Sequence, residues 1–129
     1  MYVTISMEAT DLFKCLSDAQ RLRILNLLFQ GSLCVCHLQE ILGETQVKIS
    51  KQLAYLKQRN FVRATREGTW MIYELTRESG GLLEANLEHL RSANCRECNQ
   101  LQKDLRARER LLRKITRSGC PAGVSLKIA

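Results

Sequence analysis

The stretch LQEILGETQVKISKQLAYLKQR, residues 38–59, holds two helical patterns separated by only three residues. The apolar positions of the second pattern recur at helical spacing, at Ile49, Leu53 and Leu56. Gly43 favours a tight turn between the two patterns, and Thr45 is a suitable N-cap residue for the second helix. Two helices joined by a short glycine-containing turn, the second one basic, are typical of a helix-turn-helix.

Helical patterns also precede this stretch. One apolar face is formed at spacing i, i+3, i+4, i+7 by Ala9, Leu12, Phe13 and Leu16. The segment AQRLRILNLLFQ, residues 19–30, is apolar over most of its circumference, which predicts a central helix capped by Ser17 or Asp18 and ended by Gly31. The helix before the turn is expected to run from about Leu33 to Leu42.

A hairpin and two more helices are predicted after it. FVRATREGTWMIYELT, residues 61–76, is rich in β-branched and aromatic residues around Glu67-Gly68, which predicts a basic β-hairpin, or wing. Helical apolar stripes then recur at Leu83, Leu87 and Leu90 and at Leu101, Leu105, Leu112 and Ile115. The predicted fold is mainly α with a β-hairpin wing, a winged helix-turn-helix. We expect a DNA-binding and dimerisation domain over 1–98, a basic helix over 99–117 and a flexible tail over 118–129.

Charge and composition indicate the kind of partner. The chain has 129 residues, a net charge of +7 and no long uncharged apolar run, so we expect no membrane span and a cytoplasmic location. The N-terminus is too polar for a signal peptide. Residues 46–66 contain six basic residues and no acidic one, and residues 103–117 contain seven basic residues against two acidic ones. Such basic stripes are the electrostatic signature of phosphate binding, although a solvated charged face has the same composition.

The six cysteines are expected to be thiols, because cytosolic proteins seldom contain structural disulfides. Cys34 and Cys36 lie one residue apart at the predicted start of a helix, where regular geometry would point their side chains to nearly opposite sides. Thiolates select soft ions such as trivalent arsenic and antimony, and a helix N-terminus lowers the pKa of a thiol. We therefore expect chelation to distort the first turn of this helix. The alternative is that both cysteines are small core residues.

Three segments carry a specific resemblance: LFKCLSDAQRLRILNLL (12–28), LCVCHLQEIL (33–42) and TQVKISKQLAYLKQRNFVRATREGTWMIYEL (45–75). They resemble the ArsR/SmtB family of metal-sensing repressors, and most closely its arsenic-responsive members, over residues 8–76. The resemblance implies a homodimer built on the first and fifth helices that binds a palindromic operator and leaves it when metalloid binds. The family's box places an acidic residue where this chain has His37. Many arsenic sensors also have a third cysteine where this chain has Gln39.

Several ligand sets remain open at this point. The resemblance favours Cys34 and Cys36 as ligands of trivalent arsenic or antimony, or of a methylated arsenical, with a third ligand from Cys15, His37, solvent or a C-terminal cysteine. An alternative or additional site is offered by Cys95, Cys98 and Cys120. A thiol-redox-sensing repressor of the same fold is the main competing function, and a cadmium-, lead- or zinc-responsive repressor is another. Zinc is disfavoured because only part of the family's zinc set is present, at Glu84, Glu88 and His89. His37 is expected on the surface and Cys15 in the core.

The predicted DNA contacts lie on the second helix of the helix-turn-helix and on the wing: Gln46, Lys48, Ser50, Lys51, Gln52 and Arg66. Lysines suit phosphate or guanine and glutamine suits adenine. No constellation of acid, base and nucleophile is present, so no enzyme activity and no organic cofactor are expected. The sequence thus predicts a metalloid-responsive transcriptional repressor that binds a double-stranded DNA operator.

Overall fold

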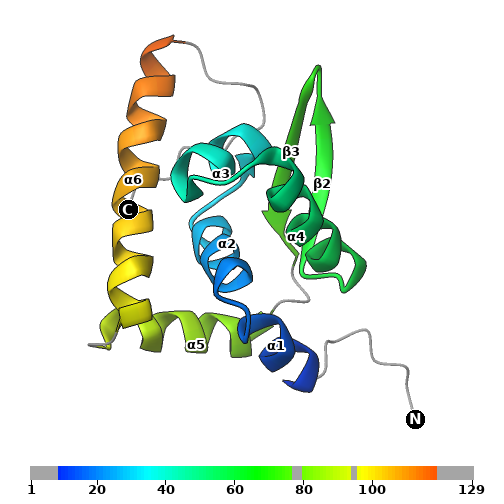
Figure 1. Cartoon of the computed structure of the whole chain (residues 1–129), viewed down its shortest axis with the longest axis vertical. Helices are drawn as coiled ribbons and strands as arrows, with labels where there is room; N and C mark the ends of the chain where they lie inside the picture. The colour runs from blue at the N-terminus through cyan, green and yellow to red at the C-terminus, as the bar shows by residue number, and fades with distance from the viewer. Residues whose placement is uncertain (1–8, 77–79, 94–95, 119–129) are drawn as a thin grey trace.

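The computed structural model describes residues 9–76, 80–93 and 96–118. The order of its elements (Figure 1) is α1 (Ala9–Leu16), α2 (Ala19–Phe29), β1 (Leu33–Cys34), α3 (Val35–Leu42), α4 (Gln46–Gln58), β2 (Val62–Glu67), β3 (Trp70–Leu75), α5 (Gly80–Ser92) and α6 (Arg96–Ser118). Together they form a winged helix-turn-helix, with α3 and α4 as the two helices of the motif. This confirms the predicted fold class.

The helix boundaries follow from local capping. Asp18 caps α2, where its Oδ1 accepts hydrogen bonds from the backbone N–H groups of Gln20 and Arg21 at 2.9 and 3.1 Å. Thr45 caps α4, where its hydroxyl oxygen accepts from the N–H of Lys48 at 3.3 Å. Gly43 adopts a left-handed conformation with a φ of 66° at the end of α3, a geometry that glycine adopts without strain. These caps place the turn of the motif where the sequence predicts it.

The sheet is antiparallel and has the strand order β1-β3-β2. In the wing, β2 pairs with β3 from Val62↔Leu75 to Glu67↔Trp70, so the hairpin turn consists of Gly68 and Thr69. The predicted centre at Glu67-Gly68 is wrong by one residue, because Glu67 still belongs to the paired strand. The two-residue strand β1 pairs with the other edge of β3, with Cys34 opposite Ile72. The sequence did not reveal β1, and the expectation that α3 begins at about Leu33 is wrong by two residues.

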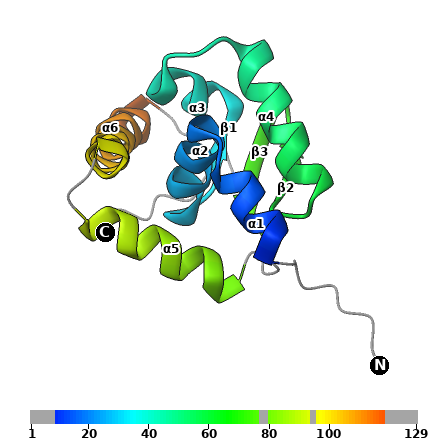
Figure 2. The same ribbon diagram turned by 60° about the horizontal axis from the view of Figure 1, so that its bottom comes forward.

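The core surrounds α2. Five consecutive residues of this helix are fully or almost fully buried, at Ile24, Leu25, Asn26, Leu27 and Leu28. Figure 2 shows α2 enclosed by α1, α3, α5 and α6. One prediction fails at the edge of this core, because Phe13 lies on the predicted buried face of α1 yet keeps 51% of its surface exposed.

Helix α6 packs along α2 and α3 (Figures 1 and 2) and contributes Leu101 and Leu112 to the same core cluster. It is also held by polar contacts, because Asp104 is 2% exposed and accepts two hydrogen bonds from Arg23 of α2 at 2.8 and 3.0 Å. Asn26 adds a bond from its side-chain amide to the Leu101 carbonyl. The domain division at residue 98 remains a prediction. Among the described helices, none is both long and apolar enough to cross a membrane.

Candidate metalloid site and DNA-facing surface

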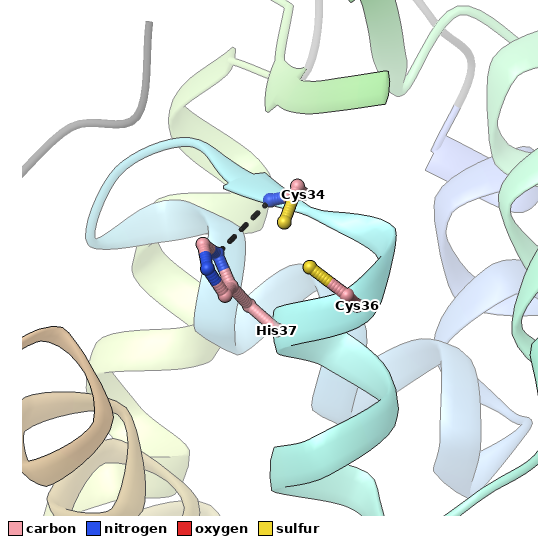
Figure 3. Close-up of side chains that lie close together, drawn as sticks. All are labelled: Cys34, Cys36 and His37. Carbon is pink, nitrogen blue, oxygen red and sulfur yellow. Dashed lines mark hydrogen bonds between the residues drawn. The ribbon is translucent and has the colours of Figure 1, made fainter. Parts of the chain in front are cut away.

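A cluster of two thiols and one imidazole lies at the junction of β1 and α3 (Figure 3). Ligand atoms of Cys34, Cys36 and His37 all lie within 4.8 Å of one another. Cys34 is the N-cap residue of α3, with an extended backbone, φ −87° and ψ 164°. Cys36 and His37 follow in the first helical turn. The change from strand to helix therefore brings the three side chains together.

This geometry corrects the expected placement of the two cysteines. The sequence predicts both cysteines in one regular helix, whose first turn would have to distort before one ion could reach both sulfurs. The placement is wrong, because Cys34 belongs to β1 and its extended backbone directs its sulfur toward Cys36 (Figure 3). The distortion on chelation stays a prediction.

The protonation of the thiols also differs from expectation. Partial desolvation and the neighbouring Cys34 thiol raise the pKa of Cys36 to about 12 and outweigh the backbone N–H groups at the helix N-terminus, which lower it. A second negative charge beside the first would be disfavoured further. The two side chains differ in access, since Cys34 is 1% exposed while Cys36 faces solvent. One sulfur of the pair is thus closed to solvent and the other is open to it.

His37 is 5% exposed, which contradicts its expected place on the surface. Its Nδ1 accepts a hydrogen bond from the Cys34 N–H at 3.4 Å, so the neutral ring carries its proton on Nε2. The imidazole thereby occupies the N3 position of a capping box, where glutamate or glutamine is usual. Burial and the charge of Arg108 on α6 lower the pKa of His37, and Glu40 opposes this shift. His37 is therefore neutral at physiological pH and holds α3 to β1.

We predict a pH-dependent loss of stability that originates at His37. Its folded-state pKa lies below the ordinary 6.5, so the unfolded chain takes up this proton first as the pH falls. The stability that neutral His37 contributes is fully present above about pH 6.5 and is lost as the pH falls below that value. His37→Gln keeps an acceptor at N3 but cannot titrate. In metal-free buffer, urea unfolding at pH 7 and pH 5 should show a larger loss of unfolding free energy in the natural protein than in this variant. His89→Gln, at an exposed histidine of α5, is the matched control.

The remaining candidate ligands are not part of this cluster. Cys15 is fully buried in the core, as expected, and burial raises the pKa of its thiol to about 11. Cys98 is buried and disulfide-bonded, so it is not the free thiol that was expected. Cys95 and Cys120 lie outside the described residues. The partial zinc set on α5 is exposed and forms no group that could hold a metal within the described ranges: Glu84, Glu88 and His89.

The predicted DNA-contacting residues lie on α4 and on strand β2 of the wing. The side chains of five of them are exposed: Gln46, Lys48, Ser50, Lys51 and Arg66. The buried side of α4 consists of the three predicted apolar residues, each with 0% exposure: Ile49, Leu53 and Leu56. The α4 surface is basic and faces away from the core, as a DNA-reading surface requires.

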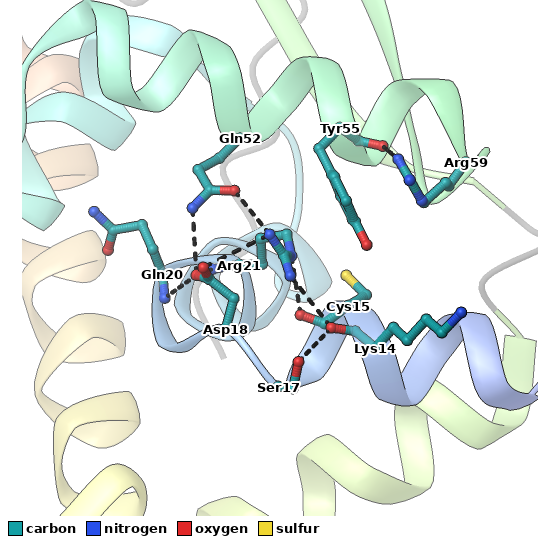
Figure 4. A network of polar contacts seen from close by, with 9 residues as sticks. All are labelled: Lys14, Cys15, Ser17, Asp18, Gln20, Arg21, Gln52, Tyr55 and Arg59. Carbon is teal, nitrogen blue, oxygen red and sulfur yellow. Dashed lines mark hydrogen bonds and ion pairs between the residues drawn. The ribbon is translucent and has the colours of Figure 1, made fainter.

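Gln52, the sixth of these residues, is turned toward α2 (Figure 4). Its amide nitrogen donates to the Asp18 carboxylate at 3.3 Å, and its amide oxygen accepts from Arg21 at 3.4 Å. Arg21 also donates to the Cys15 carbonyl at 3.1 Å, and its guanidinium lies 4.0 Å from the centre of the Tyr55 ring. This network fixes α4 against the ends of α1 and α2.

Two arginines escaped the sequence analysis. Arg21 has one local signal, its spacing of three residues from the N-cap Asp18, and the two side chains form an ion pair at 3.6 Å. Arg108 is 2% exposed on α6 and lies beside the thiol cluster, where its charge acts on His37. Its local signal is its place on the apolar stripe of α6, seven residues after Leu101 and four before Leu112, where the neighbouring basic residues Arg106 and Arg110 are exposed.

Comparisons with known proteins identify the family to which this fold belongs. Residues 18–64 match the family model described as bacterial regulatory protein, arsR family. The arsenical resistance operon repressor of Bacillus subtilis is 43% identical over 58% of this chain and 73% of its own length.

Two solved structures extend the likeness to three dimensions. The AntR antimony-specific transcriptional repressor is 33% identical, with a TM-score of 0.55 over 62% of this chain and 70% of its own. Reduced HlyU from Vibrio cholerae is 28% identical, with a TM-score of 0.60 over 68% of this chain and 90% of its own. These relatives are DNA-binding transcriptional regulators and not enzymes. The chain therefore belongs to the arsR family of bacterial regulatory proteins and is a transcriptional repressor of that family.

Proposed function

We propose that this repressor releases its operator when trivalent arsenic or antimony binds Cys34 and Cys36. The observation that carries the proposal is the convergence of both sulfurs and the His37 imidazole within 4.8 Å. The names of its relatives supply the class of inducer, since they include an arsenical resistance operon repressor and an antimony-specific repressor.

The chemistry suits two neutral thiols. Arsenous acid exchanges two hydroxyl groups for two sulfurs, forming two As–S bonds while each thiol proton leaves in a water molecule. No net charge has to be created, so the raised pKa of Cys36 is no obstacle. The third position on arsenic keeps a hydroxyl or takes the His37 nitrogen, whereas a monomethyl arsenical requires the two sulfurs alone. Cys15 is disfavoured as the third ligand because it is fully buried and lies outside the cluster.

The position of the site explains how binding reaches DNA. Cys34 pairs with Ile72 of the wing strand β3, and α3 leads through the turn at Gly43 into α4. An ion that draws Cys34 and Cys36 together acts on the wing and on α4 at once. Linkage then requires that the metalloid bind the free protein more tightly than the DNA complex, by the same factor that weakens DNA binding.

The test is an equilibrium titration of the full chain with a fluorescent operator duplex, in the absence and presence of arsenite. The coupling free energies typical of allosteric proteins predict that arsenite lowers operator affinity by about 5- to 150-fold. An operator affinity that arsenite and antimonite leave unchanged would refute the proposal.

On the surface of α4 and the wing, we assign DNA contacts to Gln46, Lys48, Ser50, Lys51 and Arg66. Gln52 would need to leave Asp18 before it could read an adenine.

We further propose that the repressor is a homodimer built on α1 and α5, acting in the cytoplasm. Both helices lie at the same side of the molecule (Figures 1 and 2), and each exposes a large apolar side chain: Phe13 is 51% and Leu82 is 44% exposed. A palindromic operator matches the twofold symmetry of such a dimer.

The dimer proposal predicts that Phe13→Glu combined with Leu82→Glu yields a folded monomer. In the dimer, the two introduced glutamates of each protomer would be buried at the interface and would face the same glutamates of the partner. Their repulsion disfavours association. Sedimentation should show the natural chain at twice the mass of the variant, and operator affinity should fall at least tenfold. The control for the sedimentation result is Val47→Glu, which places the same charge on an apolar residue of α4 that is 63% exposed and should leave the natural mass unchanged. A natural chain that sediments as a monomer at micromolar concentration would exclude the interface.

One observation favours a second function, thiol-redox sensing. Cys98 is disulfide-bonded and buried at the start of α6, a helix that packs on α3. A peroxide would form such a bond by taking two electrons and two protons from two thiols, giving one disulfide and two waters. Release by peroxide without arsenite, abolished by Cys98→Ser, would identify this function.

A further inference from the structure

The most outward face of α4 contains neither Gln46 nor Gln52. Val47, Lys51 and Ala54 follow the spacing i, i+4, i+7 and therefore share one face of the helix. That face lies opposite the fully buried stripe that begins at Ile49. All three outward residues are exposed, and Val47 keeps 63% of its surface in solvent. A partner that lies against the start of this helix therefore contacts Val47.

Exposure of a single apolar residue is ordinary and assigns nothing by itself. A second observation bears on what Val47 can contact, because Gln52, the glutamine predicted to read adenine, is bonded to other residues of the protein. Both polar atoms of the Gln52 amide are bonded to α2, the nitrogen to Asp18 and the oxygen to Arg21 (Figure 4). Gln52 thus positions α4, and the outward face presents an aliphatic, a cationic and a methyl side chain, with Gln58 following at the end of the helix.

The bases offer one partner for an aliphatic group in the major groove. Thymine alone carries a methyl group there, on C5, and apolar side chains recognise it by contact. The N-terminal residues of the second helix of a helix-turn-helix are those that reach base edges, and Val47 is the second residue of α4. Ala54 is small enough to let the helix approach closely. Lys48 and Lys51 supply charge complementary to the phosphates on either side.

We propose that Val47 reads the C5-methyl group of a thymine in each half-site and thereby sets part of the operator sequence. This rests on the proposed use of α4 as the DNA-reading helix. Gln52 acts in the same scheme as a positioning residue, held by Asp18 and Arg21. The specificity of the repressor then includes an apolar contact in addition to hydrogen bonds.

The experiment removes the methyl group from the DNA. The full chain selects an operator from a random duplex library, and each thymine of the half-site is then replaced in turn by uracil, which lacks only that methyl. One replacement should weaken binding about fourfold, the value of one buried methyl-sized group. The same replacement should have no effect on Val47→Ser, which lacks the aliphatic branches. Val47→Thr keeps one methyl and should keep part of the penalty.

Controls separate this inference from the proposed function. Lys51→Ala should weaken binding to the thymine and uracil duplexes equally, since a phosphate contact ignores the methyl group. Selection of no operator at all would contradict DNA reading by this chain, and not this contact in particular. Three results would overturn the assignment itself: a selected half-site without thymine, uracil duplexes that all bind as well as the parent, or a penalty that persists unchanged in Val47→Ser.

Discussion

Replacing Cys34 and Cys36 together by serine should leave operator binding intact and abolish release by arsenite. A hydroxyl is a hard donor and does not form a stable bond with trivalent arsenic in competition with water. The affinity of the natural protein should fall about 5- to 150-fold with arsenite, and that of the double variant should not change. Operator titrations with each protein, with and without arsenite, measure both quantities.

Two comparisons make this result specific. Circular dichroism at increasing temperature checks that the serine at the buried position 34 has not unfolded the repressor. Cys95→Ser combined with Cys98→Ser removes the C-terminal pair and should still respond to arsenite. If this second variant fails to respond while the Cys34/Cys36 variant is still released, the sensing site lies in the C-terminal segment and the thiol cluster at β1 is structural.

Truncating either buried leucine of α6 should strongly destabilise the whole repressor. Leu101 and Leu112 are both 0% exposed and pack in the same core cluster as α2. A buried leucine changed to alanine costs about 2–5 kcal/mol, which is a large part of the stability of a domain of this size. Urea unfolding of Leu101→Ala and Leu112→Ala measures the loss of unfolding free energy.

The matched control is Lys103→Ala, an exposed position on the same helix that should change stability by less than about 0.5 kcal/mol. If the leucine variants are as stable as this control, α6 is an appendage. The predicted boundary at residue 98 would then separate two independent parts. A large loss of unfolding free energy would show that α6 and the winged helix-turn-helix unfold together as one cooperative unit.

The parts of the fold that depend on local signals could be predicted from the sequence. The capping side chains of Asp18 and Thr45 fix two helix starts by bonds within three residues, and each appears at the predicted position. Gly68 marks the hairpin turn for the same reason, since its φ of 63° is a left-handed conformation that glycine adopts easily. In each case the determining contact is short in sequence.

The parts that depend on distant contacts could not be predicted. A strand of two residues has no periodicity, so β1 becomes visible only through its pairing with β3, almost forty residues later. The burial of His37 and Arg108 requires α6 to lie against α3. The contact of Gln52 with α2 requires the helix-turn-helix to close on Asp18. The identity of the thiol cluster was therefore accessible from the sequence, but its geometry and protonation were not.

Under the proposed function, the unequal access of the two thiols gives the switch an order of events. Arsenic from solution meets Cys36 first, because Cys34 is closed off at 1% exposure. The first bond forms at a rate proportional to the arsenite concentration. The second is a ring closure within the protein, favoured by the high effective concentration of the tethered arsenic but limited by how often Cys34 becomes reachable. The rate of operator release then has an upper limit. The local opening of the β1–α3 junction sets this limit, and a higher arsenic concentration cannot raise it.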